Sequence, residues 1–170
     1  KKKKNSAWGG WSTGSSSSAR MLKNKRHLDS LCKVVDPNVK HTLNFATEGR
    51  NYSNMRTGAL YVDGTLIKDS DAKLDIVAGL SIHEKLHLVH TQPLVKWQKK
   101  YAYDKRLSNA QTDLLHSIGN IIEDEYIESQ LAKTHAGYVT YIDKVKEHFF
   151  AKQDIATIKG NVIADVLNTL

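Results

Sequence analysis

The sequence of 170 residues is poor in the features that define several classes of protein. It has a single cysteine, Cys32, which excludes a disulfide framework and a zinc site built from thiolates. No apolar run approaches the length of a membrane-spanning helix, and no hydrophobic core of a signal peptide is present. These absences favour a protein of the reducing cytoplasm without a membrane partner. Any metal would have to be held by histidine and carboxylate side chains.

Negative charge is scarce in the first 40 residues, and this scarcity produces the net charge of +7. Residues 1–40 carry ten lysines and arginines against Asp29 and Asp36, whereas residues 41–170 carry fifteen against sixteen acids. Residues 1–18 join a lysine run to Gly/Ser-rich sequence, which is typical of a flexible arm. Such an arm either contacts nucleic acid or another acidic partner, or is only a solvated tail.

The hydrophobic patterns predict a mainly helical α+β domain with a small antiparallel sheet. A strand is expected over 41–46. Residues 59–62 and 65–67 flank Asp63-Gly64 and predict a two-residue hairpin, whereas 48–56 has the composition of a polar loop. Apolar spacing and end signals predict helices over 18–35, 72–90, 109–133, 138–150 and 155–170.

The predicted helix 72–90 is apolar on most of its sides. Mainly Ser81 and Lys85 are left as a polar strip. A helix with this distribution is buried between layers rather than lying on the surface. Histidines on such a helix need partners for their ring nitrogens.

Within this helix lies the motif H-E-x-x-H, formed by His83, Glu84 and His87. The i, i+4 spacing places both imidazoles one turn apart on a single face of a helix. Two neutral ring nitrogens so placed can bind one zinc ion, with Glu84 beside them as general base. The alternative, two core histidines bonded to the backbone, does not account for the carboxylates described next.

A catalytic zinc needs three protein ligands and one open position. The third would come from elsewhere in the fold, and the predicted helix 109–133 carries a dense carboxylate cluster. One carboxylate can bind the metal while a neighbour holds a histidine ring through its other nitrogen. The cluster consists of Glu123, Asp124, Glu125 and Glu128.

The two motifs together resemble a known class of enzyme. H-E-x-x-H followed by a glutamate-bearing helix resembles the gluzincin branch of zinc metallopeptidases. The pattern N-x-x-E-D-x-x-I-E, from Asn120 to Glu128, is similar to predicted metallopeptidase domains of bacteria and phages that often accompany von Willebrand A-type domains. The similarity covers about residues 41–131. Tyr126 stands where these relatives usually have arginine.

The resemblance implies that residues 19–170 form a zincin-like domain of a longer chain, located in a host cytoplasm or a virion. It implies a Zn²⁺ ion bound by His83, His87 and Glu123, with Asp124 as the orienting residue or the alternative ligand. The expected reaction is hydrolysis of peptide bonds in a protein or peptide substrate. Glu84 would take the proton of the attacking water, and a strand of the hairpin would bind the substrate.

Some roles and some functions stay open at this stage. Candidate donors to the oxyanion are His116, Tyr126, Tyr138 and Tyr141. His90 lies a full turn too far along the helix to share the metal, so we interpret it as structural or orienting.

The first alternative function is a non-catalytic zincin-fold module that assembles into a phage particle or larger complex. The second is a protease recruited to nucleic acid by residues 1–18.

Overall fold

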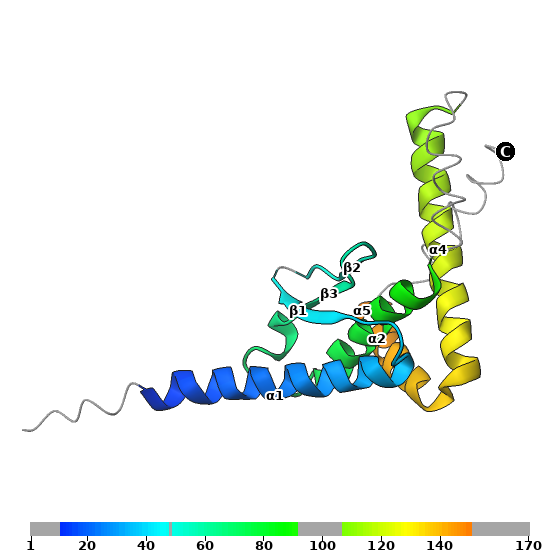
Figure 1. Ribbon diagram of the computed structural model, residues 1–170. Coiled ribbons are helices and arrows are strands. Elements are labelled where there is room, and N and C mark those ends of the chain that lie inside the picture. Colours follow the sequence, from blue (N-terminus) through cyan, green and yellow to red (C-terminus); the bar gives the residue numbers. More distant parts are fainter. Residues whose placement is uncertain (1–10, 48, 92–106, 151–170) are drawn as a thin grey trace, which may run out of the picture.

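Helix α2 (Leu74–His90) lies at the centre of the fold, and the other elements pack around it (Figure 1). The computed structural model describes residues 11–47, 49–91 and 107–150. These ranges confirm the mainly helical α+β class. The other elements are α1 (Trp11–Val35), β1 (Thr42–Ala46), β2 (Tyr52–Asn54), β3 (Ala59–Asp63), η1 (Thr65–Ile67), α4 (Asn109–Thr134), η2 (Ala136–Tyr138) and α5 (Val139–Phe150).

The core has two parts, one on each side of α2, which confirms the predicted burial of this helix between layers. On one side α2 packs against α1 and the sheet, and on the other side against α4 and α5. The first part includes Leu28, Cys32, Leu43, Leu60, Val62, Ile67, Val77, Ala78, Leu80 and Leu88. The second consists of Ile82, Leu86, Ile127, Leu131 and Ile142.

The strip expected to be polar on α2 is also enclosed, because Ser81 and Lys85 are both 0% exposed. Ser81 Oγ donates a hydrogen bond to the carbonyl oxygen of Val77, at 2.7 Å. Lys85 Nζ donates to the carbonyl oxygen of Val39 and lies 3.3 Å from His41 Nδ1. Both side chains therefore satisfy their polar groups inside the fold, as burial requires.

The prediction of an antiparallel sheet is wrong for one pair of strands: the sheet is mixed, with the strand order β1-β3-β2. The predicted strand 41–46 is confirmed as β1, which runs parallel to β3, whereas β2 pairs antiparallel with β3. The prediction of a loop over 48–56 is wrong at residues 52–54, which form β2. The hairpin turn lies at 55–58, where Gly58 N donates to Asn54 O at 2.8 Å and Gly58 has a φ of +71°.

The predicted hairpin at Asp63-Gly64 is wrong. Asp63 Oδ1 accepts a hydrogen bond from Thr65 N at 2.8 Å, which turns the chain into η1 instead of into a second strand. Ile67, at the end of this turn, is fully buried in the core.

The helices largely follow the prediction, with one difference at the first of them. α1 begins at Trp11, several residues before the start predicted at residue 18. Serine is tolerated in a helix, and no proline interrupts residues 11–18. The part of α1 that packs against the rest of the protein can therefore continue toward the N-terminus as further helical turns. The first ten residues, residues 92–106 and the predicted helix 155–170 lie outside the described residues.

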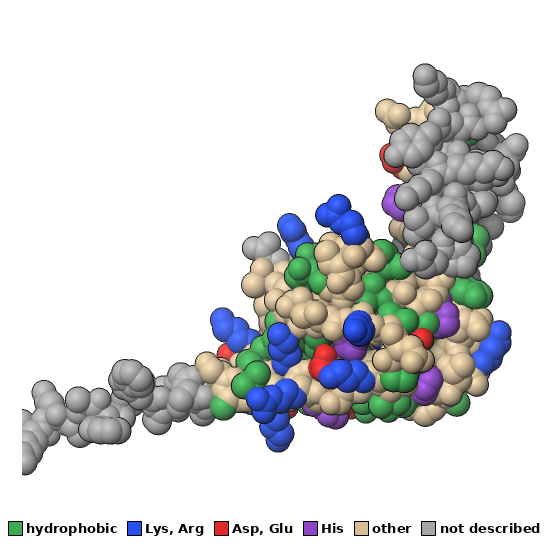
Figure 2. All heavy atoms as spheres, in the orientation of Figure 1, with side chains coloured by type: hydrophobic (Ala, Val, Ile, Leu, Met, Phe, Trp, Pro, Cys, Tyr) green, Lys and Arg blue, Asp and Glu red, His purple; other side chains and the backbone are tan. Residues whose placement is uncertain are grey.

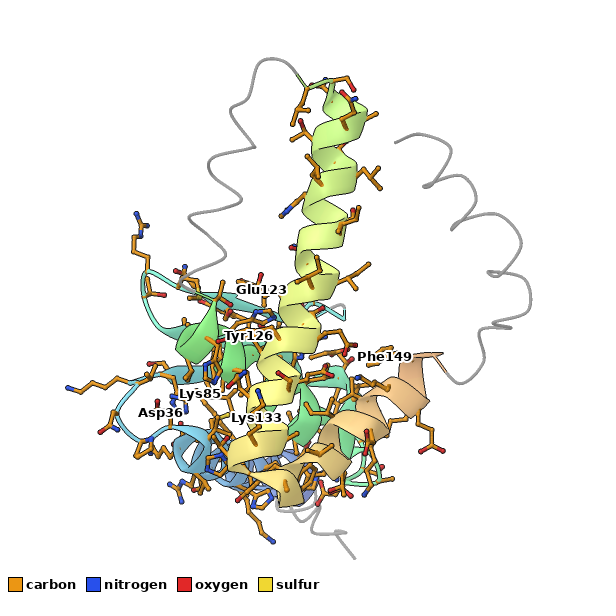
Figure 3. The ribbon with its side chains drawn as sticks, turned by 90° about the vertical axis from the view of Figure 1, so that its right-hand side faces the viewer. Asp36, Lys85, Glu123, Tyr126, Lys133 and Phe149 are labelled. Carbon is orange, nitrogen blue, oxygen red and sulfur yellow. The ribbon has the colours of Figure 1, made fainter. Side chains whose placement is uncertain are left out.

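Helix α4 stands across the end of α2, and its N-terminal half rises beyond the body of the molecule (Figures 1 and 3). A capping box begins it, because the Ser108 side chain accepts from Gln111 N while the Gln111 side chain accepts from Ser108 N. Its buried residues are Gly119, Glu123, Ile127 and Leu131.

Among the described residues, no helix is long and apolar enough to cross a membrane.

We expect Gly79→Ala to lower the free energy of unfolding, despite the better helix propensity of alanine. A Cβ at Gly79 would lie 2.3 Å from the Tyr141 carbonyl oxygen and 2.5 Å from Val145 Cγ2, so α5 would have to move. The expected loss is about 1–3 kcal/mol in urea unfolding. The control is Gly137→Ala, where a Cβ meets no atom within 4 Å. An equal loss in both variants would contradict this packing.

Candidate metal centre

Helices α2 and α4 bring His83, His87 and Asp124 together, and these three side chains could hold a metal ion. The two histidines lie one turn apart on α2, as predicted, with their Nε2 atoms 3.2 Å apart. Asp124 Oδ1, from α4, lies 3.5 Å from each of these nitrogens. Three ligand atoms therefore converge from two helices, as a catalytic metal site requires.

Glu123, expected as the third ligand, lies on the other side of His87. Its Oε1 is 3.1 Å from His87 Nδ1 and accepts a hydrogen bond from Thr91 Oγ1. The side chain is buried and points from α4 toward α2 (Figure 3). The geometry thus favours the alternative that the sequence left open, with Asp124 as ligand and Glu123 as orienting residue. Neighbouring residues project about 100° apart on a helix, so the crossing of α2 and α4 decides between them.

A second carboxylate lies behind the other histidine. Glu128 Oε1 is 3.5 Å from His83 Nδ1, and Glu128 Oε2 is 2.5 Å from Nζ of Lys146 on α5. Each histidine therefore has a carboxylate of α4 at Nδ1 and directs Nε2 toward the other histidine. This is how ligating histidines are commonly held in metal sites.

The pKa values of the two imidazoles are shifted in opposite directions. Burial lowers the pKa of His83, but Asp124, Glu128 and Glu84 outweigh it and raise the pKa to about 9. Burial and the positive charge of His83 lower the pKa of His87, against the effect of Glu123. A protonated His83 can then donate to a neutral His87 through the 3.2 Å contact between their Nε2 atoms. A divalent cation would replace this shared proton between the same two atoms.

Glu84 is the buried carboxylate beside these ligands, with an exposed fraction of 5%. Its Oε2 has no hydrogen-bond partner among the described residues. Burial raises the pKa of Glu84 to about 7; Asp124 raises it further, whereas the charge of His83 and a hydrogen bond with Ser53 oppose the rise. A buried carboxylate with one unpaired oxygen is suited to accept a proton.

Two clefts meet at this centre, and His83, Glu84 and Asp124 line both of them. The cleft beside the edge strand β2 has a volume of about 640 Å³; Ser53 lines it on one side and His116 on the other. The second cleft has a volume of about 430 Å³ and lies between α4 and α5. Its mainly apolar lining includes Leu80, Ile121, Ile142, Val145 and Phe149.

The candidate oxyanion donors differ in whether they line one of the two clefts. His116 lines the cleft beside β2, whereas Tyr126, Tyr138 and Tyr141 are not among the lining residues of either cleft. Tyr126 instead meets the edge of His90, with ring centroids 6.3 Å apart. His90 is not part of the described group of side chains that could hold a metal ion.

Three residues of the centre were not predicted. Thr91, which donates to Glu123, follows His87 by one helical turn, so the i, i+4 spacing could have revealed it. Ser53 and Lys146 come from β2 and α5, far from both motifs in the sequence. No local pattern connects them to the site, because only the tertiary fold brings them there.

No protein-family model matches the chain, and no curated protein or solved structure shows significant similarity to it. The chemistry of this centre is therefore inferred from its own geometry: the convergence of His83, His87 and Asp124, the carboxylate behind each histidine, and the unpaired oxygen of Glu84.

We expect Asp124→Asn to weaken metal binding more than Glu123→Gln does, because only Asp124 offers an oxygen to both Nε2 atoms. Loss of an orienting partner such as Glu123 typically costs about 10–100-fold in affinity. Titration with Zn²⁺ against a chromogenic chelator measures both losses. Asp113→Asn, an exposed position on the same helix, is the control and should bind like the wild type. A larger loss for Glu123→Gln would contradict the assignment.

Proposed function

We propose that the protein is a zinc-dependent peptidase of the zincin class. The single observation that carries the proposal is the position of Glu84. Its buried carboxylate, with one oxygen that has no hydrogen-bond partner among residues 11–47, 49–91 and 107–150, lies next to a His83–His87–Asp124 cluster where two clefts meet. A structural metal site needs neither a free carboxylate nor access for a substrate.

Zinc is the metal that these residues fit best. Two imidazole nitrogens and one carboxylate oxygen form a typical set for a catalytic zinc, with room for a further ligand. Glu123 and Glu128 would hold the two rings in the orientation that presents Nε2. Together with Glu84 and Asp124, they give the site four carboxylates, a negative environment that attracts a divalent cation.

The reaction that follows is hydrolysis of an amide bond. When bound, zinc would supply Lewis acidity, which lowers the pKa of a coordinated water and polarises the scissile carbonyl. Glu84 accepts the proton of the attacking water on its unpaired oxygen and transfers it to the leaving amine. His116, in the cleft beside β2, is the candidate donor to the developing oxyanion.

The substrate would bind as an extended peptide along β2. Within the part of the chain that the structure describes, this strand pairs with β3 alone and its other edge can accept a further strand. Tyr52 and Ser53 line the larger cleft. The smaller cleft would take the side chain next to the scissile bond. Its apolar lining and its volume of about 430 Å³ favour a large apolar residue there.

The placement of the elements supports a zincin-like domain. An H-E-x-x-H helix packs against a small sheet, and a second helix provides the third ligand. The pattern from Asn120 to Glu128 supports kinship with the predicted metallopeptidase domains of bacteria and phages. With Asp124 rather than a glutamate as third ligand, the proposed site departs from the gluzincin pattern in that position.

We expect the zinc-loaded protein to cleave peptides in a complex peptide library, with large apolar residues enriched next to the cleaved bond. A chelator should abolish cleavage and added zinc should restore it. Glu84→Gln should retain zinc but lower the rate by about 10²–10⁴-fold, since it removes the proton acceptor. Mass spectrometry of the products measures the rate and maps the cleaved bonds.

Two outcomes would contradict the proposal. If zinc binds but Glu84→Gln cleaves as fast as the wild type, Glu84 is not the base and the metal is structural. If the zinc-loaded wild type cleaves nothing, the alternative function, a non-catalytic assembly module, explains the site better. Glu147→Gln, an exposed glutamate on α5, is the control for loss of one carboxylate and should cleave at the wild-type rate.

A further inference from the structure

Lys146 on α5 belongs to neither of the two sequence motifs, yet it contacts a carboxylate of the metal centre. We infer that Lys146 is a positioning residue, which holds Glu128 in the orientation that fixes the ring of His83. The inference concerns the metal site of the proposed function and rests on it. It adds α5 to the elements that determine metal affinity.

The two oxygens of Glu128 face different partners. Oε1 is 3.5 Å from His83 Nδ1, and Oε2 is 2.5 Å from Lys146 Nζ. The Glu128 side chain is only 15% exposed, whereas the Lys146 side chain is 47% exposed, so the carboxylate is enclosed and depends on its protein partners for compensation of its charge. Without the ammonium group, the carboxylate would turn toward solvent or toward another donor, and His83 would lose the group that orients its ring.

The position of Lys146 is fixed by the packing of α5. Gly79 allows α5 to approach α2 closely, one turn before His83. Ile142, one turn before Lys146, is buried against α2 and α4. The i, i+4 spacing places Lys146 on the same face of α5 as Ile142, directed toward the carboxylates of α4. Glu125 Oε1 is 4.0 Å from the same ammonium group, but its side chain is 75% exposed and competes weakly.

Lys144 provides a matched control on the same helix. Its ammonium group pairs with Asp75 at the start of α2, and both side chains are about half exposed. This ion pair also joins α5 to α2, but it does not reach the metal centre. Loss of Lys144 therefore reproduces the loss of one positive charge and one ion pair between helices without disturbing Glu128.

The experiment compares Lys146→Met, Lys146→Arg and Lys144→Met by chelator competition with Zn²⁺ and by the visible spectrum of the Co²⁺-loaded protein. We expect Lys146→Met to weaken zinc binding roughly 3–10-fold, less than loss of a direct orienting partner. Its Co²⁺ spectrum should also change. Lys146→Arg, which keeps the ion pair, should restore wild-type affinity and spectrum, and Lys144→Met should alter neither. Thermal unfolding of the metal-free variants checks that all are folded.

A double-mutant cycle completes the test. Because Lys146 acts through Glu128, adding Lys146→Met to Glu128→Gln should cause no further loss of zinc affinity. A full additional loss, or equal affinities and spectra for Lys146→Met and Lys144→Met, would overturn the inference. A wild type that binds neither metal would overturn it together with the proposed function. If the coupling is found but no peptide is cleaved, the positioning role stands and only the peptidase proposal fails.

Discussion

The crossing of α2 and α4 is the constraint on which the rest of the structure depends. At this crossing, two imidazoles of α2 face the carboxylates of Glu123, Asp124 and Glu128 on α4. Partly buried carboxylates repel one another and lose hydration, so they need positive charge to compensate. The contacts of Ile82 and Leu86 with the apolar residues of α4 hold the helices together. A bound cation would add stability at the same place.

Most residues of α2 are buried, and this burial fixes the helix in the position at which α4 crosses it. In addition to its apolar residues, the polar residues Ser81 and Lys85 of this helix are buried. Each donates a hydrogen bond to a backbone carbonyl oxygen. Gly79 lets α5 approach closely enough to cover the site. On the face shown in Figure 2, lysine and arginine side chains project mainly along α1 and beside the sheet.

The sequence predicted what depends on local spacing, and it failed where tertiary contacts decide. The i, i+4 spacing of His83 and His87 sufficed to predict their shared face. The choice between Glu123 and Asp124 depended on the angle at which α4 crosses α2, which no local pattern encodes. The prediction of a hairpin at Asp63-Gly64 was wrong because the Asp63 side chain accepts a hydrogen bond that turns the chain into η1. Ile67, at the end of η1, is buried in the core. Lys146 has no sequence signal, since only the fold brings it to Glu128.

Anomalous X-ray diffraction from crystals grown with zinc, recorded above and below the zinc absorption edge, tests the central claim most directly. We expect one strong difference peak within bonding distance, about 2.0–2.2 Å, of His83 Nε2, His87 Nε2 and an Asp124 oxygen. Glu123 should remain at His87 Nδ1. A peak bonded to Glu123 in place of Asp124, or no peak between α2 and α4, would contradict it.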